Sequence, residues 1–262
     1  MENSSASPTS PGSPTVFPPN AFGAGSTILT ALGAVVLFIL PVIIAIIAWF
    51  AVHGYDVAGL NRAFVGLFGI GVQSAAEIIV IGFLLAVLPS VSKTSLYNLG
   101  FRAPQGADWG KIGLAIAGMF IVVNLLGSVL MSALHFKTPE LAIAVFTHMV
   151  GWQKILFAFF AVIVGPVWEE FVFRIFLFNA MRKWWGFWPG AILSSLLFGL
   201  AHAQQPLVPA MFLSLSLPLA LGGIVLCWVY TRTGSAYANM ATHAGFNALS
   251  LALISVAPQL AK

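Results

Sequence analysis

Long apolar stretches separated by short polar segments run from residue 27 to near the C-terminus. Most of them reach the roughly 20 residues that cross a bilayer core as an α-helix. We expect seven membrane spans, at about residues 27–52, 64–88, 112–134, 155–181, 187–203, 207–230 and 236–256. The fourth contains Gly165-Pro166, and because proline cannot donate a helical hydrogen bond, the helix should kink or restart there. The pattern predicts an all-α, polytopic transmembrane helical bundle, with eight helices instead of seven if each half of the broken helix crosses.

The amino-acid composition is that of a membrane protein and limits the classes of partner that the chain can have. Hydrophobic residues make up 60% of the chain and charged residues only 7%, against about 25% charged in soluble domains. The net charge of +4 comes from basic residues scattered between the apolar stretches, where they set topology. We therefore expect contact with membrane lipid and no nucleic-acid partner. The segment 1–26 is rich in Ser, Pro and Thr and predicts a disordered tail, followed by a single transmembrane domain over 27–262.

Three charged residues interrupt the fourth apolar stretch, within the sequence GPVWEEFVFR. An isolated charge at mid-membrane costs about 2.5–3.5 kcal/mol, so a cluster of charges needs a reason. Glu170 and Arg174 are spaced i,i+4 on one helical face, which favours an ion pair. Glu169 is rotated by about 100° from Glu170 and has no such partner. This spacing makes Glu169 the candidate catalytic residue. The alternative is that the three charged residues form a structural cluster that fixes helix packing.

Polar side chains also lie in two later apolar stretches and in one earlier one. His202 is near the end of the fifth stretch, and His243 and Asn247 share one face of the seventh. Because polar groups in lipid turn toward one another or toward a wet cavity, we expect these residues to share one site with Glu169. The structural alternatives are that His202 is an interfacial histidine at a helix end and that His243 and Asn247 form an interhelical hydrogen-bonding pair. Gln73 and Glu77 of the second stretch either line a cavity or pack between helices.

A carboxylate, two imidazoles and an amide suit cleavage of a bond by water. Glu169 could take a proton from water as a general base, and Asn247 could donate to the oxyanion. The two histidines, His202 and His243, could bind a metal ion together with Glu169, or one could hold the water while the other polarises the carbonyl of the bond to be cleaved. The chain has no HExxH sequence, so the zincin arrangement is excluded.

Three short motifs resemble those of the CAAX protease and bacteriocin-processing family of intramembrane proteases, also called CPBP or Abi, which includes the Ras-converting CAAX endopeptidase. Two glutamates followed after three residues by arginine occur as Glu169 to Arg174. Phenylalanine and histidine at i,i+4 occur as Phe198 and His202, and histidine and asparagine as His243 and Asn247. The motifs stand in the family's order, each on an apolar segment, and place the family-like catalytic core at about residues 152–257.

The resemblance implies a role for each motif residue. Glu169 would activate water with help from His202, and His243 with Asn247 would stabilise the tetrahedral intermediate. Glu170 and Arg174 would be the supporting pair. The resemblance leaves two mechanisms open: a metalloprotease with Zn²⁺ or another divalent ion held by Glu169, His202 and His243, or a metal-free glutamate protease.

The resemblance also implies an endopeptidase that acts on membrane-associated substrates, such as prenylated CAAX proteins, bacteriocin precursors or other lipid-modified proteins and peptides. We expect a multi-pass protein of a prokaryotic inner membrane, with its oligomeric state left open. A non-catalytic scaffold or immunity protein of the same fold is the alternative, although no motif residue is lost. An ion-coupled transporter is a further alternative, but the chain lacks the paired repeats that many transporters show.

Overall fold

The computed structural model describes residues 21–135, 149–202 and 209–260, and these residues form helices and no strand. The predicted all-α class is confirmed. The helical elements in chain order are α1 (Ala24–His53), α2 (Val57–Val65), α3 (Leu67–Ser92), α4 (Asp108–Ala133), α6 (Trp152–Phe159), η1 (Phe160–Val164), α7 (Gly165–Glu169), η2 (Glu170–Phe178), α8 (Asn179–Trp185), α9 (Phe187–Ala201), α10 (Pro209–Met211), η3 (Phe212–Ser216), α11 (Leu217–Thr233) and α12 (Ala236–Leu260). Here η denotes a π-helix.

The predicted N-terminal tail over 1–26 falls mostly outside the described residues, which begin at Ala21. From there on the chain departs from the expectation. Phe22 is fully buried in the core, and its carbonyl accepts hydrogen bonds from the side chains of Lys183 and Trp184 at 3.0 and 3.1 Å. Helix α1 then begins at Ala24. The bundle therefore holds the chain a few residues earlier than composition indicates.

Five helical segments within the described ranges are long and apolar enough to cross a membrane. They are Ala24–His53, Leu67–Ser92, Asp108–Ala133, Trp152–Trp185 and Phe212–Thr233. The shorter apolar helix α9 and the 25-residue helix α12 complete the bundle. Within the described residues, each of the seven predicted stretches is thus largely helical, and the fourth lies inside one continuous helical segment of 34 residues, Trp152–Trp185. Since such a segment would extend about 50 Å, it is long enough to cross at a tilt.

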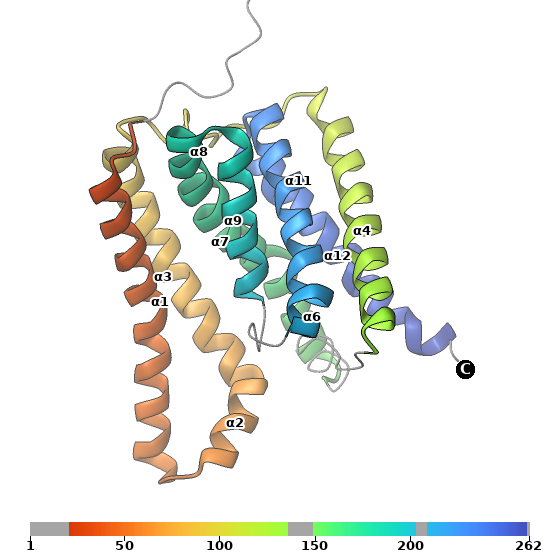
Figure 1. Cartoon of the computed structure of the whole chain (residues 1–262). Helices are drawn as coiled ribbons and strands as arrows, with labels where there is room; N and C mark the ends of the chain where they lie inside the picture. Colours follow the sequence, from red (N-terminus) through yellow and green to blue (C-terminus); the bar gives the residue numbers. More distant parts are fainter. Residues whose placement is uncertain (1–20, 136–148, 203–208, 261–262) are drawn as a thin grey trace, which may run out of the picture.

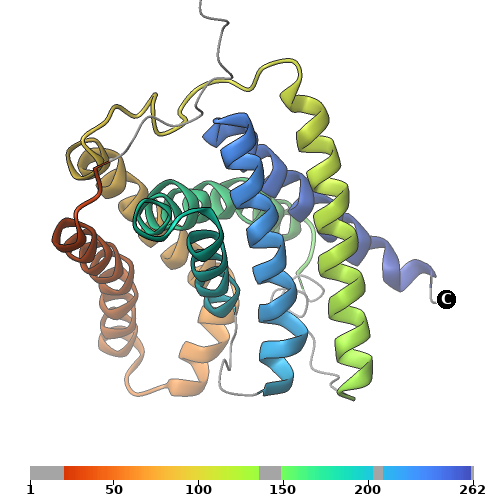
Figure 2. The same cartoon turned by 45° about the horizontal axis from the view of Figure 1, so that its top comes forward.

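The helices are arranged around α11 and the segment that carries the first motif (Figures 1 and 2). Helices α1 and α3 pack side by side at one edge of the bundle, and α4 stands at the opposite edge. Helix α11 lies between α9 and α4 and packs against both, while α12 packs against α4 and α11. The three segments that carry the motifs therefore meet inside the bundle.

The surface of the bundle is far more apolar than that of a soluble domain, and several polar side chains are fully buried. Large apolar side chains such as Leu29 on α1 and Leu114 on α4 are about 70% exposed, at 71% and 70%. The fully buried positions include Glu170, Asn179 and Asn239, whose polar groups lie between helices. In hydrocarbon, polar groups must find partners within the protein, whereas apolar side chains can face lipid. This pattern shows a multi-pass integral membrane protein.

The predicted break at Gly165-Pro166 takes the form of a change in hydrogen-bond register. The helix continues through both residues, but π-helical turns precede and follow α7. The N–H of Gly165 donates to the carbonyl of Phe160, five residues back. In that register the carbonyl of Ala161 would be paired with the nitrogen of Pro166, which carries no hydrogen. The proline therefore leaves the Ala161 carbonyl available for a partner from another helix.

Candidate active site

Glu170 is held by donors from two helices and is completely buried. Its Oε1 accepts from Arg174 Nη1 at 3.0 Å and lies 2.8 Å from His243 Nδ1. Its Oε2 accepts from the side-chain amide of Asn239. The ion pair predicted from the i,i+4 spacing is present, with both side chains at most 1% exposed. With both carboxylate oxygens engaged, Glu170 ties the first motif to α12 and has little capacity left to bind a water molecule.

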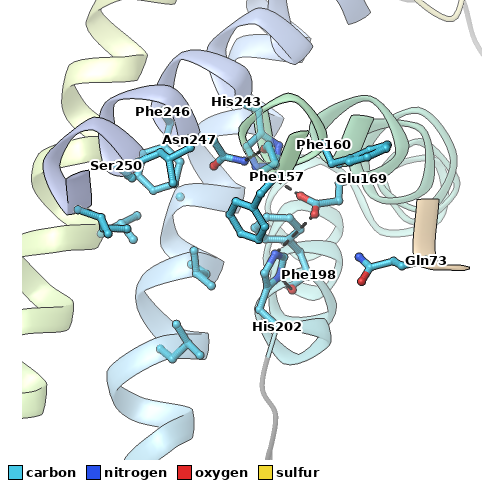
Figure 3. Close-up of a pocket in the computed structure, with 18 of the residues that line it drawn as sticks. Gln73, Phe157, Phe160, Glu169, Phe198, His202, His243, Phe246, Asn247 and Ser250 are labelled. Atoms are coloured by element: carbon cyan, nitrogen blue, oxygen red, sulfur yellow. Dashed lines mark hydrogen bonds and ion pairs between the residues drawn. The ribbon is translucent and has the colours of Figure 1, made fainter. Parts of the chain in front are cut away.

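Glu169 faces a different set of groups, as Figure 3 shows. Its carboxylate lies between two imidazoles, with Oε1 3.6 Å from His202 Nε2 and Oε2 3.3 Å from His243 Nε2. The side chain is 15% exposed, in contrast to that of Glu170. The adjacent glutamates thus divide as the spacing predicts: one is enclosed by donors, and the other faces two histidine rings from other helices.

The outer ring nitrogens of both histidines are fixed by acceptors. His202 Nδ1 lies 2.9 Å from the carbonyl oxygen of Phe198, which can only accept, so this nitrogen carries the proton. His243 Nδ1 likewise faces the carboxylate of Glu170. In their neutral forms both rings therefore present the lone pair of Nε2 toward Glu169. Two lone pairs and a carboxylate that converge in this way suit a ligand carrying protons, such as water, or a cation.

Phe198 joins the second motif to the other two. Its ring lies under the guanidinium of Arg174, with the Arg174 Cζ 4.3 Å from the ring centroid. The same ring meets His202 and His243 edge to face, at centroid distances of 4.7 and 5.6 Å. Phe198 therefore orients both imidazoles and shields the buried cation from lipid.

Asn247 lies beside this cluster, and its hydrogen bond within the described residues goes to a backbone carbonyl and not to Glu169 or either histidine. Its Nδ2 donates to the carbonyl of Ala161 at 2.8 Å, the carbonyl that Pro166 leaves free. The amide nitrogen carries a second N–H that this bond does not use. Asn247 and His243 are one turn apart on α12, so both side chains face the same space (Figure 3).

That space is a cavity of about 900 Å³. It is within the range of cavities that bind ligands of drug or peptide size. Its walls contain Glu169, His202, His243 and Asn247 together with many apolar side chains from α3, α4, α11 and α12. The six motif residues are thus divided between the wall and the layer behind it, since Glu170 and Arg174 do not line the cavity. Their assignment as catalytic residues stays a prediction.

Two groups that bind residues of the cluster lie outside the three motifs: the side chain of Asn239 and the backbone carbonyl of Ala161. Asn239, which donates to Glu170, precedes His243 by four residues, so its helical face was readable from the sequence. The backbone carbonyl of Ala161 had no such signal, because its availability depends on a π-helical register. The structure also places Gln73 and Glu77 of α3 on the cavity wall.

The donor types around Glu169 are those of a zinc site: a carboxylate and two imidazoles whose outer nitrogens are held by acceptors. In residues 21–135, 149–202 and 209–260, however, no group of three or more His, Cys, Asp or Glu side chains is close enough to enclose an ion. The chemistry of the donors fits a divalent cation, and it fits a directly held water equally well.

A comparison with protein families gives a match over the part of the chain that contains the three motifs. Residues 151–249 match the model described as Type II CAAX prenyl endopeptidase Rce1-like. This segment carries an Rce1-like domain. It contains all three motifs, and the family resemblance inferred from them is confirmed. No curated protein and no solved structure gives a significant match to the chain.

Proposed function

We propose that this protein is an intramembrane endopeptidase of the CAAX type, which cleaves a peptide bond of a membrane-associated substrate with water activated by Glu169. The observation that carries the proposal is the position of the Glu169 carboxylate, between Nε2 of His202 and Nε2 of His243 at 3.6 and 3.3 Å, on the wall of a cavity inside the bundle. The Rce1-like domain over 151–249 supports the reaction class.

The reaction follows from the groups on the wall. A water molecule between Glu169 and His202 gives a proton to the Glu169 carboxylate, and its oxygen attacks the carbonyl carbon of the substrate. The negative oxygen that results is stabilised by the unused N–H of Asn247, and by Nε2–H of His243 when that ring is protonated. Glu169 then passes the proton to the substrate nitrogen as the C–N bond breaks. The products are an amine and a carboxylic acid, which releases its proton to solvent and becomes a carboxylate.

The remaining motif residues position this machinery. Glu170 holds His243 through Nδ1 and is itself held by Arg174 and Asn239. A divalent ion, if one binds, would be held by Glu169, His202 and His243 and would supply further polarisation of the water. Metal analysis of the purified protein, with activity measured before and after chelation, distinguishes the two forms of the mechanism.

The cavity supports a substrate that is apolar over much of its length. Apolar side chains from several helices surround the polar centre, which suits a prenylated CAAX terminus or the membrane segment of a bacteriocin-type precursor. A panel of lipid-modified and unmodified peptides, analysed by mass spectrometry, separates these classes.

The decisive test is Glu169→Gln, which keeps the size of the side chain and removes the base. We expect purified protein in detergent to lose peptide cleavage while its folding survives. Cleavage by the Glu169→Gln variant at the rate of the unaltered protein would refute the role of Glu169.

A further inference from the structure

A second carboxylate, that of Glu77, lines the cavity beside Glu169 and has no part in the reaction described above. Glu77 lies on α3 and is only 3% exposed. Its Oε1 accepts a hydrogen bond from Gln73 Nε2 at 2.8 Å, one turn earlier on the same helix. Gln73 also lines the cavity, and its side chain lies on the other side of Glu169 from Asn247 (Figure 3). The pair thus forms a polar patch on the α3 wall.

Glu77 differs from the other two glutamates in its partners. Glu170 contacts Arg174 and His243, and Glu169 contacts two imidazoles, but throughout the described ranges no Lys, Arg or His lies within ion-pair distance of Glu77. A buried carboxylate without a cation is costly in a membrane protein, and an apolar side chain would pack α3 without that cost. A ligand that supplies a positive charge would remove that cost.

We propose that Glu77 and Gln73 form a subsite for a protonated amine of the substrate or product. This inference rests on the proposed function, because the subsite belongs to the same cavity as Glu169. An ammonium group offers three donors, so it can bond to the second carboxylate oxygen of Glu77 and to the amide oxygen of Gln73 together. A charge-assisted hydrogen bond of this kind is stronger than a neutral one and would compensate the buried charge.

Two sources can supply such an amine. One is the side chain of a lysine near the cleaved bond. The other is the product itself: hydrolysis places the hydroxyl on the carbonyl carbon and a proton on the nitrogen, and the released α-amine takes one further proton from solvent to become an ammonium. In the first case the subsite selects the substrate, and in the second it holds the released fragment.

The test measures binding, so that it does not depend on cleavage. The full chain with Glu169→Gln serves as the background, which also removes the other carboxylate that faces the two histidines. The probes are short apolar peptides with one lysine placed at each position in turn, and the same peptides with norleucine instead. A second pair of probes consists of apolar peptides with a free or an acetylated N-terminus.

We expect the background protein to bind the lysine or the free-amine probe at least about tenfold more tightly than its neutral counterpart. Adding Glu77→Gln should bring that ratio to about one. Adding Ser128→Ala, a neutral substitution on the α4 wall of the same cavity, should leave the ratio unchanged. A preference in the lysine arm identifies substrate selection, and one in the N-terminal arm identifies product binding.

Equal binding of all charged and neutral probes by the background protein would overturn the subsite, and this result does not require a second variant to fold. A preference that persists in Glu77→Gln would overturn it as well. Failure of the proposed function is distinguishable: if no peptide is cut by the unaltered protein but the preference for amines follows Glu77, the subsite stands without the peptidase. If peptides are cut but no preference exists, the peptidase stands without the subsite.

Discussion

The Glu170→Gln variant should be far less stable to unfolding than the Glu169→Gln variant. Glu170 is fully buried and receives donors from Arg174, His243 and Asn239. Glutamine keeps one acceptor oxygen but turns the other into a donor, so at least one of these donors faces an NH₂ group. It also leaves the Arg174 guanidinium, 1% exposed, without its counter-charge.

The size of the effect follows from the loss of one partner of a buried ion pair, which costs about 3–5 kcal/mol. That is a large part of a total stability of about 5–15 kcal/mol. At about 1.4 kcal/mol for each factor of ten, the ratio of folded to unfolded protein should fall by roughly two to three and a half powers of ten. Glu169 lies on the cavity wall and, within the described residues, forms no ion pair with Lys or Arg, so Glu169→Gln should change the free energy of unfolding by less than about 1 kcal/mol.

The assay is unfolding of the purified protein by a denaturing detergent, followed by tryptophan fluorescence, for both variants and the unaltered chain. The rate of peptide cleavage is measured on the same preparations, so that loss of activity and loss of stability can be separated. The reasoning predicts that Glu170→Gln loses stability and that Glu169→Gln loses activity alone. If Glu170→Gln is as stable as Glu169→Gln, the donors around Glu170 do not hold the bundle together and the division of roles between the glutamates is wrong.

Two further substitutions test the local geometry. In Pro166→Ala, a new backbone N–H can compete with Asn247 for the carbonyl of Ala161, so peptide cleavage should slow. Because proline costs about 3 kcal/mol in a helix interior, the stability of this variant should not fall. Unchanged cleavage would contradict this role of the proline. In Gly199→Ala, the new methyl group meets the backbone carbonyl of Ser216, so the melting temperature should drop by an amount equivalent to about 1–3 kcal/mol, and a variant as stable as the parent would show that α9 and η3 can separate at no cost.

The helices and the motif faces could be predicted because they depend on local spacing. The i,i+4 relation of Glu170 and Arg174 predicts their ion pair, and the apolar stretches predict the helical segments. The partners across helices could not be obtained in this way. That His243 Nδ1 faces Glu170 while Nε2 faces Glu169 depends on the crossing of α12 with the motif segment, which no single stretch encodes.

The fourth apolar stretch shows a second limit. Proline at position 166 predicts a defect in the helix, but not whether the chain kinks, restarts or changes register. The outcome is a π-helical register that keeps the segment continuous and frees one carbonyl, which α12 then uses through Asn247. A sequence defect that looks like a break is thus a contact point, because the backbone acceptor it exposes must be satisfied inside the membrane.

Phe198 supports the cluster although its side chain has no acid or base chemistry. Arg174 is needed to neutralise Glu170, but its guanidinium is 1% exposed and its five N–H donors cannot all be met by one carboxylate. The π-face of Phe198, 4.3 Å from Cζ, gives the cation a further attractive neighbour that is itself stable in lipid. The same ring packs edge to face against His202 and His243 and limits the rotation of both imidazole rings, which keeps them directed at Glu169. One aromatic side chain therefore couples the stability of the buried ion pair to the orientation of both imidazoles, which links the three motifs physically as well as by their order in the sequence.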